Sequence, residues 1–307
     1  MTDVILHEVG PRDGLQIERA IVPTARKIAW IERLIASGVD LIQAGSFVNP
    51  KVVPQMADAA DIFRHFAANR QPASKTRLTA LVLNEKGLER GLDAGVDYFC
   101  MGVSASDTHS EKNVGMSTAA AAERVIAMAR RAHAAGATVQ LSVQSAFGCG
   151  YEGPIPEARV LKLVDRFVDA GFTLISLADT AGHATPPQVR RLFETILRDA
   201  PQVVCACHLH DTYGLAMANA CAALDAGVRG FETAFAGLGG CPFTAVAGGN
   251  LCTEDFVHLL HRLGLRHDLT LDPLIDVAKD AEDFFARPLP GVIHRTGPVR
   301  IERPAEA

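Results

Sequence analysis

The hydrophobic positions of the chain recur in one local pattern. A stretch with helical period ends in a small residue and glycine, and an apolar run follows, as at 36–44, 94–102 and 170–178. Glycine after a helix supplies a left-handed cap, and an apolar run without alternation is typical of a strand buried on both faces. Within 156–170 the apolar residues recur at i, i+3, i+4, i+7 and i+8 from Val160, which is one face of a helix.

Eight such apolar runs alternate with seven helical stretches. The strands are expected at 4–9, 39–45, 77–83, 96–103, 137–144, 172–178, 202–208 and 230–236. Strict alternation predicts an α/β fold with a parallel sheet and helices outside, and eight repeats favour closure into a (β/α)8 TIM barrel. An open doubly wound sheet is the alternative, but no GxGxxG or GxxxxGK[ST] motif opens a helix, which weakens a nucleotide-binding open sheet.

Helical periodicity continues after the eighth strand, at 252–265 and 270–286. No linker composition interrupts the alternation, so we expect a single catalytic domain over 1–307. The barrel should occupy about 4–250, and extra C-terminal helices and a tail about 251–307. The end of that tail is rich in proline and arginine and is expected to be loosely held. The polar segment SASDTHSEKNVG at 104–115 is expected to be a loop, either a lid or a solvated connector.

Composition and charge narrow the class of protein. With 307 residues, of which 48% are hydrophobic, the chain can bury a large core. The net charge of −5 provides no basic field for nucleic acid or anionic lipid, and no apolar run approaches the roughly 20 residues of a membrane helix. The seven cysteines include no CxxC pair, which fits a reducing cytosol better than a disulfide framework. We therefore expect a cytoplasmic protein that binds neither nucleic acid nor membrane.

Reactive side chains gather at the carboxyl ends of the predicted strands, where barrel enzymes place their active sites. They are Arg12 and Asp13 after the first strand, Gln43 in the second, Gln140, Ser142 and Gln144 in the fifth, Asp179 after the sixth, His208, His210 and Asp211 at the seventh, and Cys241 and Asn250 after the eighth. Because the parallel strands of a barrel share one rim, we expect these side chains to surround one site.

The segment CHLHDTYG at this rim predicts a metal site. Side chains alternate faces along a strand, so His208 and His210 point the same way and both imidazoles can reach one ion. With Asp13 and the amide oxygen of Asn250 they form a nitrogen and oxygen set that suits Mg²⁺ or Mn²⁺, with Zn²⁺ or Co²⁺ as alternatives. An HxH pair alone more often serves hydrogen bonding, and Asp13 and Asp211 are alternatively helix caps, which we favour for Asp211.

Two further residues of the rim suggest chemistry on a carbonyl compound. Arg12 is either an ordinary salt-bridge partner or a forked cationic donor for a carboxylate or thioester oxygen. Cys241 taken alone would be a small buried hydrophobe. Two glycines precede it and Pro242 follows, so we expect a residue of a mobile loop whose weakly acidic thiol can deliver a proton.

The motifs EVGPRDGLQ, AGSFVNPKVVPQMAD, SEKN, ISLADT, CHLHDTYGLAMAN and GLGGCPF…GGNLCTED resemble, in order and spacing, the 3-hydroxy-3-methylglutaryl-CoA lyases. These belong to a wider group of metal-dependent barrel enzymes that includes the isopropylmalate, homocitrate and citramalate synthases. The resemblance runs from about residue 4 to residue 290, and its Gly-Gly-Cys-Pro segment is specific to the lyases. It implies a (β/α)8 barrel, usually dimeric, that acts on an acyl-CoA thioester.

The resemblance also implies roles for particular residues. The metal ligands would be Asp13, His208, His210 and Asn250. Arg12 would bind and polarise the substrate, and Cys241 would be the acid. Ser176 and Asp179 match active-site positions of the family. The candidates for the base are Asp179 and a metal-linked histidine. Gln43, Gln140, Ser142 and Ser176 are the further candidates for substrate contacts, and Lys51 and Lys112 for contacts with the phosphates of CoA.

The chain departs from the usual pattern of these lyases at two positions. Gln43 stands where they usually have glutamate, and Gln140 where they commonly have arginine. Losing an acid and a base on one rim alters the charge where substrate and metal meet, which affects the substrate more than the reaction class.

The expected reaction is metal-dependent cleavage of a 3-hydroxy-3-methylglutaryl-CoA-type thioester to acetyl-CoA and the 3-oxo acid acetoacetate. One alternative is the same lyase chemistry on another branched 3-hydroxyacyl-CoA, such as a citramalyl-like thioester. A second is a Claisen-condensing acyltransferase of the isopropylmalate or citramalate synthase type. A third is a non-catalytic barrel, which the presence of every candidate ligand and of Cys241 argues against.

Overall fold

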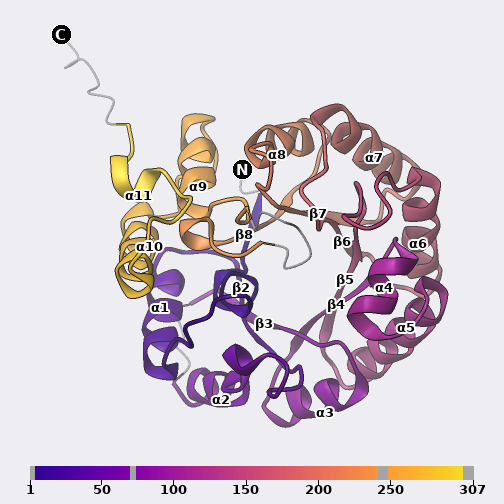
Figure 1. The fold of residues 1–307 in the computed structure, drawn as a ribbon, viewed down its shortest axis with the longest axis horizontal. Helices are drawn as coiled ribbons and strands as arrows, with labels where there is room; N and C mark the ends of the chain where they lie inside the picture. The colour runs from indigo at the N-terminus through magenta and orange to yellow at the C-terminus, as the bar shows by residue number, and fades with distance from the viewer. Residues whose placement is uncertain (1–3, 70–73, 241–247, 300–307) are drawn as a thin grey trace.

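Each of the eight apolar runs forms a strand, and neighbouring strands pair in parallel round to β8, which closes the barrel on β1 (Figure 1). The computed structural model describes residues 4–69, 74–240 and 248–299. The strands are β1 (Ile5–Glu8), β2 (Leu41–Ser46), β3 (Arg77–Leu81), β4 (Tyr98–Ser104), β5 (Thr138–Gln144), β6 (Leu174–Asp179), β7 (Val204–Leu209) and β8 (Gly230–Thr233). The predicted TIM barrel is confirmed.

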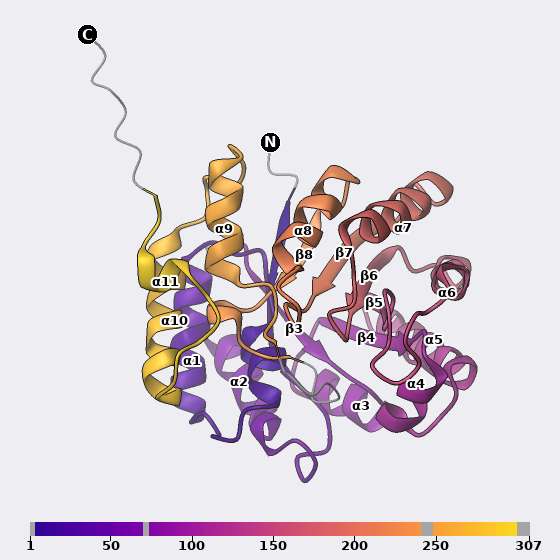
Figure 2. The same ribbon diagram turned by 45° about the horizontal axis from the view of Figure 1, so that its top comes forward.

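Helices surround the strands, and most of them bury an apolar face (Figure 2). They are α1 (Thr24–Ala36), α2 (Ala59–Ala68), α3 (Glu85–Asp93), α4 (Asp107–Val114), α5 (Thr118–Ala134), α6 (Glu157–Asp169), α7 (Pro186–Asp199), α8 (Ala216–Asp225), α9 (Thr253–Arg262), α10 (Leu271–Phe285) and α11 (Ile293–Thr296). Three single-turn elements are η1 (Gly10–Gly14), η2 (Pro54–Met56) and η3 (Phe235–Gly237). Among the described residues no helix is long and apolar enough to cross a membrane.

The segment at 104–115 was expected to be a loop, but it contains helix α4. Its signals are caps rather than hydrophobic periodicity. The Ser106 hydroxyl accepts a hydrogen bond from the His109 amide at 3.1 Å, and Gly115 ends the helix with φ of 71°. A serine at the start and a left-handed glycine at the end satisfy the unpaired backbone groups of a short polar helix.

The helices after the barrel pack on its first helix. Helix α10 lies beside α1, where the Trp30 indole donates to Asp280 at 2.8 Å (Figure 1). The Trp30 ring meets Phe284 of α10 and Phe235 of η3 edge-on, with centroids 6.2 and 5.5 Å apart. The expected C-terminal helices therefore brace η3, the turn that leads from β8 toward the rim.

Polar side chains occupy the lumen near the carboxyl ends of the strands. His208 stands beside Glu232 in the β7–β8 register, and Glu232 beside His7 in the β8–β1 register. The Gln140 amide on β5 donates to Glu232 on β8 at 2.6 Å. Because β5 and β8 are not neighbours, this hydrogen bond crosses the lumen.

Candidate active site

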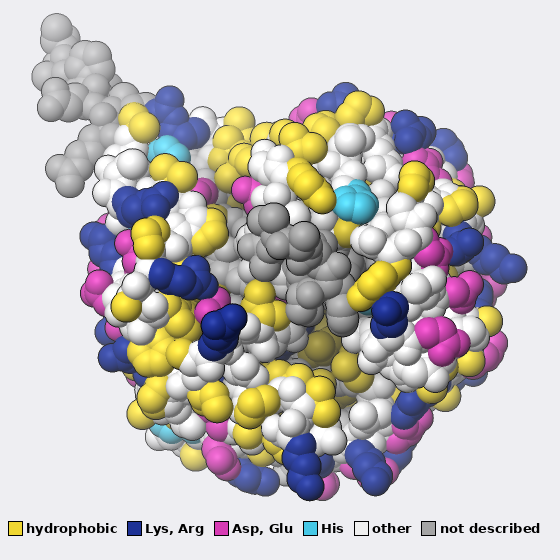
Figure 3. Space-filling model, in the orientation of Figure 1, with side chains coloured by type: hydrophobic (Ala, Val, Ile, Leu, Met, Phe, Trp, Pro, Cys, Tyr) yellow, Lys and Arg dark blue, Asp and Glu magenta, His cyan; other side chains and the backbone are white. Residues whose placement is uncertain are grey.

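A pocket of about 830 Å³ opens at the carboxyl ends of the strands. Figure 3 shows the molecule hollowed near the centre of this face. Most of the rim residues singled out by sequence line it: Arg12, Asp13, Gln43, Gln140, Ser142, Ser176, His208 and His210. Helix α4 contributes His109, Lys112 and Asn113, so the segment expected to be a lid or a connector forms part of the wall.

The two carboxylate oxygens of Asp13 have different surroundings. It lies in η1, the tight turn that follows β1, and is buried. Its Oδ1 is bound by Arg12 Nη1 at 2.5 Å and by Gln16 Nε2 at 2.9 Å. Its Oδ2 therefore remains directed at the residues of β7 and of the segment after β8.

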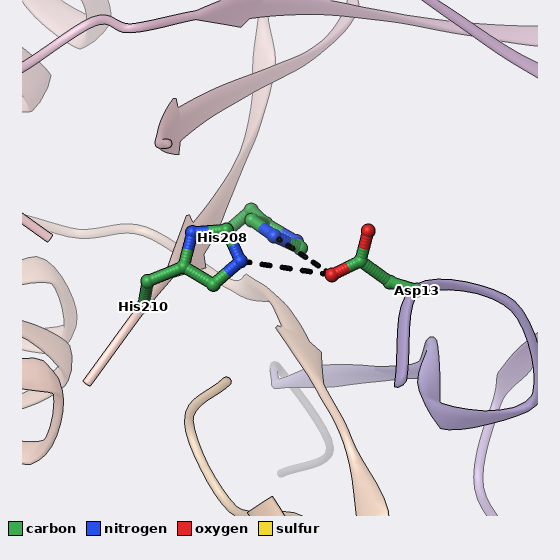
Figure 4. Close-up of side chains that lie close together, drawn as sticks. All are labelled: Asp13, His208 and His210. Atoms are coloured by element: carbon green, nitrogen blue, oxygen red, sulfur yellow. Dashed lines mark ion pairs between the residues drawn. The ribbon is translucent and has the colours of Figure 1, made fainter. Parts of the chain in front are cut away.

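The two histidines converge on that oxygen, as Figure 4 shows. His208 Nε2 lies 3.7 Å and His210 Nε2 lies 3.6 Å from Asp13 Oδ2. The imidazoles stand edge to face with centroids 4.9 Å apart. Strand alternation thus places both rings on one side, as predicted from the HxH spacing.

Asn250 joins the same cluster from the segment after β8. A backbone bridge pairs it with His210, and its Nδ2 donates to Asp13 Oδ2 at 2.9 Å. Its Oδ1 is buried and has no hydrogen-bond partner among the described residues. All four sequence-predicted ligands therefore lie together.

The donor set fits a divalent cation. The ligand atoms of Asp13, His208 and His210 lie within 4.8 Å of one another. His210 Nε2 and Asn250 Oδ1 are buried without a hydrogen-bond partner in the described part of the chain, and unpaired buried polar atoms are costly unless something binds them. Two imidazoles, a carboxylate and an amide, without thiolate, suit a cation that prefers oxygen and nitrogen.

The electrostatics of the cluster favour an ionised carboxylate. Burial alone would raise the pKa of Asp13, but Arg12 and the two histidines outweigh it and hold that pKa well below its usual range. Burial lowers the pKa of His210, but the hydrogen bond and the negative charge of Asp13 outweigh burial, so that this pKa is raised above its usual value. A carboxylate that stays charged near neutral pH is ready to bind a cation.

Arg12 is anchored on two sides. Its Nη1 binds Asp13, and its Nε donates to Gln43 Oε1. The guanidinium is buried and lines the pocket, so its remaining N–H groups are the donors it can offer to a ligand. Gln43, a predicted substrate contact, is thus already bound to Arg12 through its oxygen.

The structure does not bring the Asp179 carboxylate to the pocket. Its oxygens accept from the backbone amides of His183 and Ala184, at 2.8 and 3.1 Å, and the side chain is fully buried. Its backbone carbonyl accepts a hydrogen bond from His210 Nδ1 at 3.0 Å. Asp211 receives the Ala216 amide at 2.9 Å at the start of α8, as its predicted capping role requires.

Glu232 is a site residue that the sequence interpretation missed. It is 6% exposed and lines the pocket, with Oε2 3.0 Å from His208 Nδ1 and Oε1 bound by Gln140. Burial raises the pKa of Glu232, but its hydrogen bond to His208 and nearby histidine charge lower it to about 2. The available signal was an acidic residue inside an otherwise apolar strand, GFETA.

A second buried carboxyl, Glu8, connects the segments that follow the first and the last strand of the barrel. Its Oε1 accepts from the backbone amides of Gly10 at 2.6 Å and Phe235 at 3.2 Å. Its Oε2 lies 2.5 Å from the Thr253 hydroxyl, which also contacts Thr233 at 2.8 Å. Glu8 thus joins the turn that carries Asp13 to the segment that surrounds Asn250. Burial raises its pKa to about 8.

The predicted acid Cys241 lies outside the described residues. The six described cysteines, among them Cys205, Cys207 and Cys221, are free thiols. Burial raises the pKa of Cys205 to about 12, which fits a packing role rather than a reactive one.

Comparison with known proteins places this site in a family. The HMGL-like family model matches residues 3–280. The chain belongs to the HMGL-like family. It is 37% identical to the hydroxymethylglutaryl-CoA lyase YngG of Bacillus subtilis, over 94% of this chain and 95% of that protein. It is 39% identical to the (R)-citramalyl-CoA lyase of Chloroflexus aurantiacus, over 97% of this chain and 96% of that protein.

Solved structures of the HMGL-like family agree with the barrel. An HMG-CoA lyase from Acinetobacter baumannii, in complex with coenzyme A and 3-methylmalate, superimposes with a TM-score of 0.90 at 34% identity, covering 99% of this chain and 98% of that one. The Bacillus subtilis HMG-CoA lyase gives 0.90 at 36% identity, covering 95% and 97%. The family resemblance stated from the motifs is confirmed, and the chain is a carbon–carbon lyase.

Removing a cluster residue should weaken metal binding. Asp13→Ala and His210→Ala each delete one donor, so we expect the dissociation constant for Mn²⁺, measured by calorimetry, to rise about 10-fold or more in each. Asp211→Asn is the matched control, because this neighbouring acid caps α8 and should leave Mn²⁺ affinity unchanged. Wild-type titrations in both alanine variants would remove these residues from the site.

The buried Glu8 should make stability depend on pH. The folded-state pKa of Glu8, near 8, lies above the value of about 4.5 for an unfolded glutamate. The contribution of Glu8 to the free energy of unfolding is therefore fully present below pH 4.5 and is lost as pH rises towards 8. Glu8→Gln mimics the neutral form of the side chain. As pH rises over this range, its free energy of unfolding should increase relative to that of the wild type, by up to about 1.4 kcal/mol per pH unit. Urea unfolding from pH 5 to 8.5 measures this, and parallel profiles would contradict it.

Proposed function

We propose that the protein is a metal-dependent lyase that cleaves a 3-hydroxy-3-methylglutaryl-CoA-type thioester to acetyl-CoA and acetoacetate. The observation that carries the proposal is the convergence of His208 and His210 on one oxygen of Asp13 at the floor of the pocket. Relatives that carry the name hydroxymethylglutaryl-CoA lyase match nearly the whole chain.

A second candidate is the same chemistry on a citramalyl-CoA-type thioester. The relative from Chloroflexus aurantiacus matches this chain at least as well as the hydroxymethylglutaryl-CoA lyases do. The similar HMG-CoA lyase from Acinetobacter baumannii was solved in complex with 3-methylmalate, a short hydroxydicarboxylate. The two substrates differ by one methylene between carboxylate and carbinol carbon, and pockets discriminate such a difference by only about 10–200-fold.

Asp13, His208, His210 and Asn250 would hold a divalent cation, for which we propose Mg²⁺ or Mn²⁺. When bound, such an ion supplies a Lewis acid that makes a substrate hydroxyl easier to deprotonate. The protein's own part is to present Asp13 Oδ2 and both Nε2 atoms from rigid elements, with Asp13 Oδ1 held by Arg12 and Gln16.

The cleavage needs a base, a site for negative charge and an acid. Loss of the hydroxyl proton turns the C–O bond into a carbonyl, and the electrons of the C2–C3 bond pass to acetyl-CoA as its enolate. The Asp179 oxygens are bound in the β6–α7 turn, and both histidine Nε2 atoms would hold the cation, so we assign the proton to water in the open pocket. Arg12 stabilises charge on the thioester oxygen, and Cys241 protonates the enolate carbon to give the methyl group.

Around this centre, Ser142 and Ser176 line the pocket and are proposed to contact the acyl group. At the mouth, Lys112 lines the pocket with its Nζ 4.6 Å from the Tyr151 ring centroid, which supports a role with CoA phosphates. Lys51 is exposed and is not part of the lining. We further propose a cytoplasmic homodimer; free thiols support the compartment, and light scattering tests the dimer.

A thioester panel tests the reaction and its substrate. We expect release of acetyl-CoA from 3-hydroxy-3-methylglutaryl-CoA with Mg²⁺ and its loss with EDTA. Preference for citramalyl-CoA would transfer the assignment to the second candidate. Free CoA formed from acetyl-CoA and a 2-oxo acid, without cleavage of either thioester, would instead identify a condensing enzyme.

Cys241→Ala tests the acid. Without the thiol, the enolate carbon lacks its proton donor, so we expect kcat to fall by about 10²–10⁴-fold while the dissociation constant for Mn²⁺ stays unchanged. Cys221→Ala, which changes a half-buried thiol of α8, is the control and should retain activity. Full activity of Cys241→Ala would exclude this role.

A further inference from the structure

A hydrogen-bonded chain of three buried side chains leads across the lumen to the metal cluster. Gln140 on β5 donates to Glu232 Oε1 at 2.6 Å, and Glu232 Oε2 lies 3.0 Å from His208 Nδ1. Each of the three residues is 6–7% exposed. At its far end, Gln140 Oε1 accepts from the Tyr98 hydroxyl at 3.4 Å, which leaves the Gln140 amide group directed at Glu232.

We propose that Glu232 is a positioning residue that fixes the metal-facing nitrogen of His208, and that Gln140 holds Glu232 in place instead of binding substrate. The proposal rests on the proposed function only in taking His208 as a ligand.

The chemistry of imidazole supplies the reason. A neutral imidazole carries one N–H, and the hydrogen bond made by one nitrogen decides which form is present. A carboxylate at Nδ1 can only accept, so the proton resides on Nδ1 and the lone pair on Nε2. That Nε2 is the atom 3.7 Å from Asp13 Oδ2. Carboxylates in this position also raise the basicity of a ligating histidine.

The partner of the other histidine shows that Glu232 adds charge as well as orientation. His210 Nδ1 faces the backbone carbonyl of Asp179 at 3.0 Å, a neutral acceptor that imposes the same tautomer. The two ligands are therefore set alike but with acceptors of different charge. His208 is the one that Glu232 makes the stronger donor to a cation.

Gln140 is needed because His208 pairs with one oxygen of the Glu232 carboxylate and leaves the other oxygen without that partner. A buried carboxylate oxygen without a partner is costly, and the Gln140 amide satisfies it. Since Gln140 spends its oxygen on Tyr98 and its nitrogen on Glu232, it supports the ligand set from across the lumen.

Exchange of the acid and the amide tests this chain. In Glu232→Gln, one amide oxygen cannot accept from both His208 and Gln140, so a donor faces a donor. We expect the Mn²⁺ dissociation constant to rise about 10–100-fold. In the double variant Glu232→Gln/Gln140→Glu, the carboxylate now at position 140 accepts from the amide at position 232, whose oxygen is free for His208 Nδ1–H. Most of the lost affinity should return.

The matched control is Glu152→Gln, another carboxylate with several partners, which accepts from Ser106 at 2.8 Å and Thr108 at 2.7 Å and does not line the pocket. It should keep wild-type Mn²⁺ affinity. Wild-type affinity in Glu232→Gln, or a double variant as weak as the single one, would overturn the proposal. A merely structural role would lower the melting temperature of the metal-free protein without rescue by the exchange.

A measurement on the unaltered protein covers the case in which Glu232→Gln fails to fold. Long-range ¹⁵N–¹H spectra of the Mg²⁺-loaded protein distinguish the tautomers of each histidine, with His208 assigned by the His208→Asn variant. We expect its proton on Nδ1, and a proton on Nε2 would overturn the proposal. Because neither metal affinity nor tautomer involves a thioester, a wrong substrate assignment leaves both results intact.

Discussion

The site depends on one carboxylate whose two oxygens have different partners. Asp13 Oδ1 is fixed by Arg12 and Gln16, and this leaves Oδ2 as the point on which His208 and His210 converge. Because Oδ2 lies beside two imidazoles and the Asn250 amide, these four residues form a candidate cation site.

Barrel closure gives this carboxylate its partners. β1 pairs with β8, so the turn after the first strand lies against the segment after the last, although more than 200 residues separate Asp13 from Asn250. Glu8 reinforces the contact with hydrogen bonds to Gly10, Phe235 and Thr253. Helix α10 supports η3 from outside through Trp30. The geometry of the cluster therefore depends on contacts that the C-terminal elements make with the barrel.

Local periodicity explains what the sequence predicted. Strand alternation set the common side of His208 and His210, and the rim position of each strand end brought in Asp13, Arg12 and Asn250. Contacts across the lumen follow from rotamers and barrel curvature, which no period encodes, so Glu232 was missed. Asp179 was predicted at the rim and lies at the end of β6, but its turn binds the carboxylate. Helix α4 was not predicted because its sequence signals are the caps at its two ends and not an apolar face.

The two glutamines of the rim each contact a charged side chain of the pocket. Gln43 binds Arg12, and Gln140 binds Glu232, so each amide acts on the pocket through a charged neighbour. An amide carries no net charge, so the charged groups beside the two glutamines remain the Arg12–Asp13 ion pair and Glu232 with His208, in a buried site where screening is weak. We propose that the position of a substrate carboxylate relative to these charged groups matters more than the shape of the amides. A change of charge at either position would therefore shift substrate preference through Arg12 or His208.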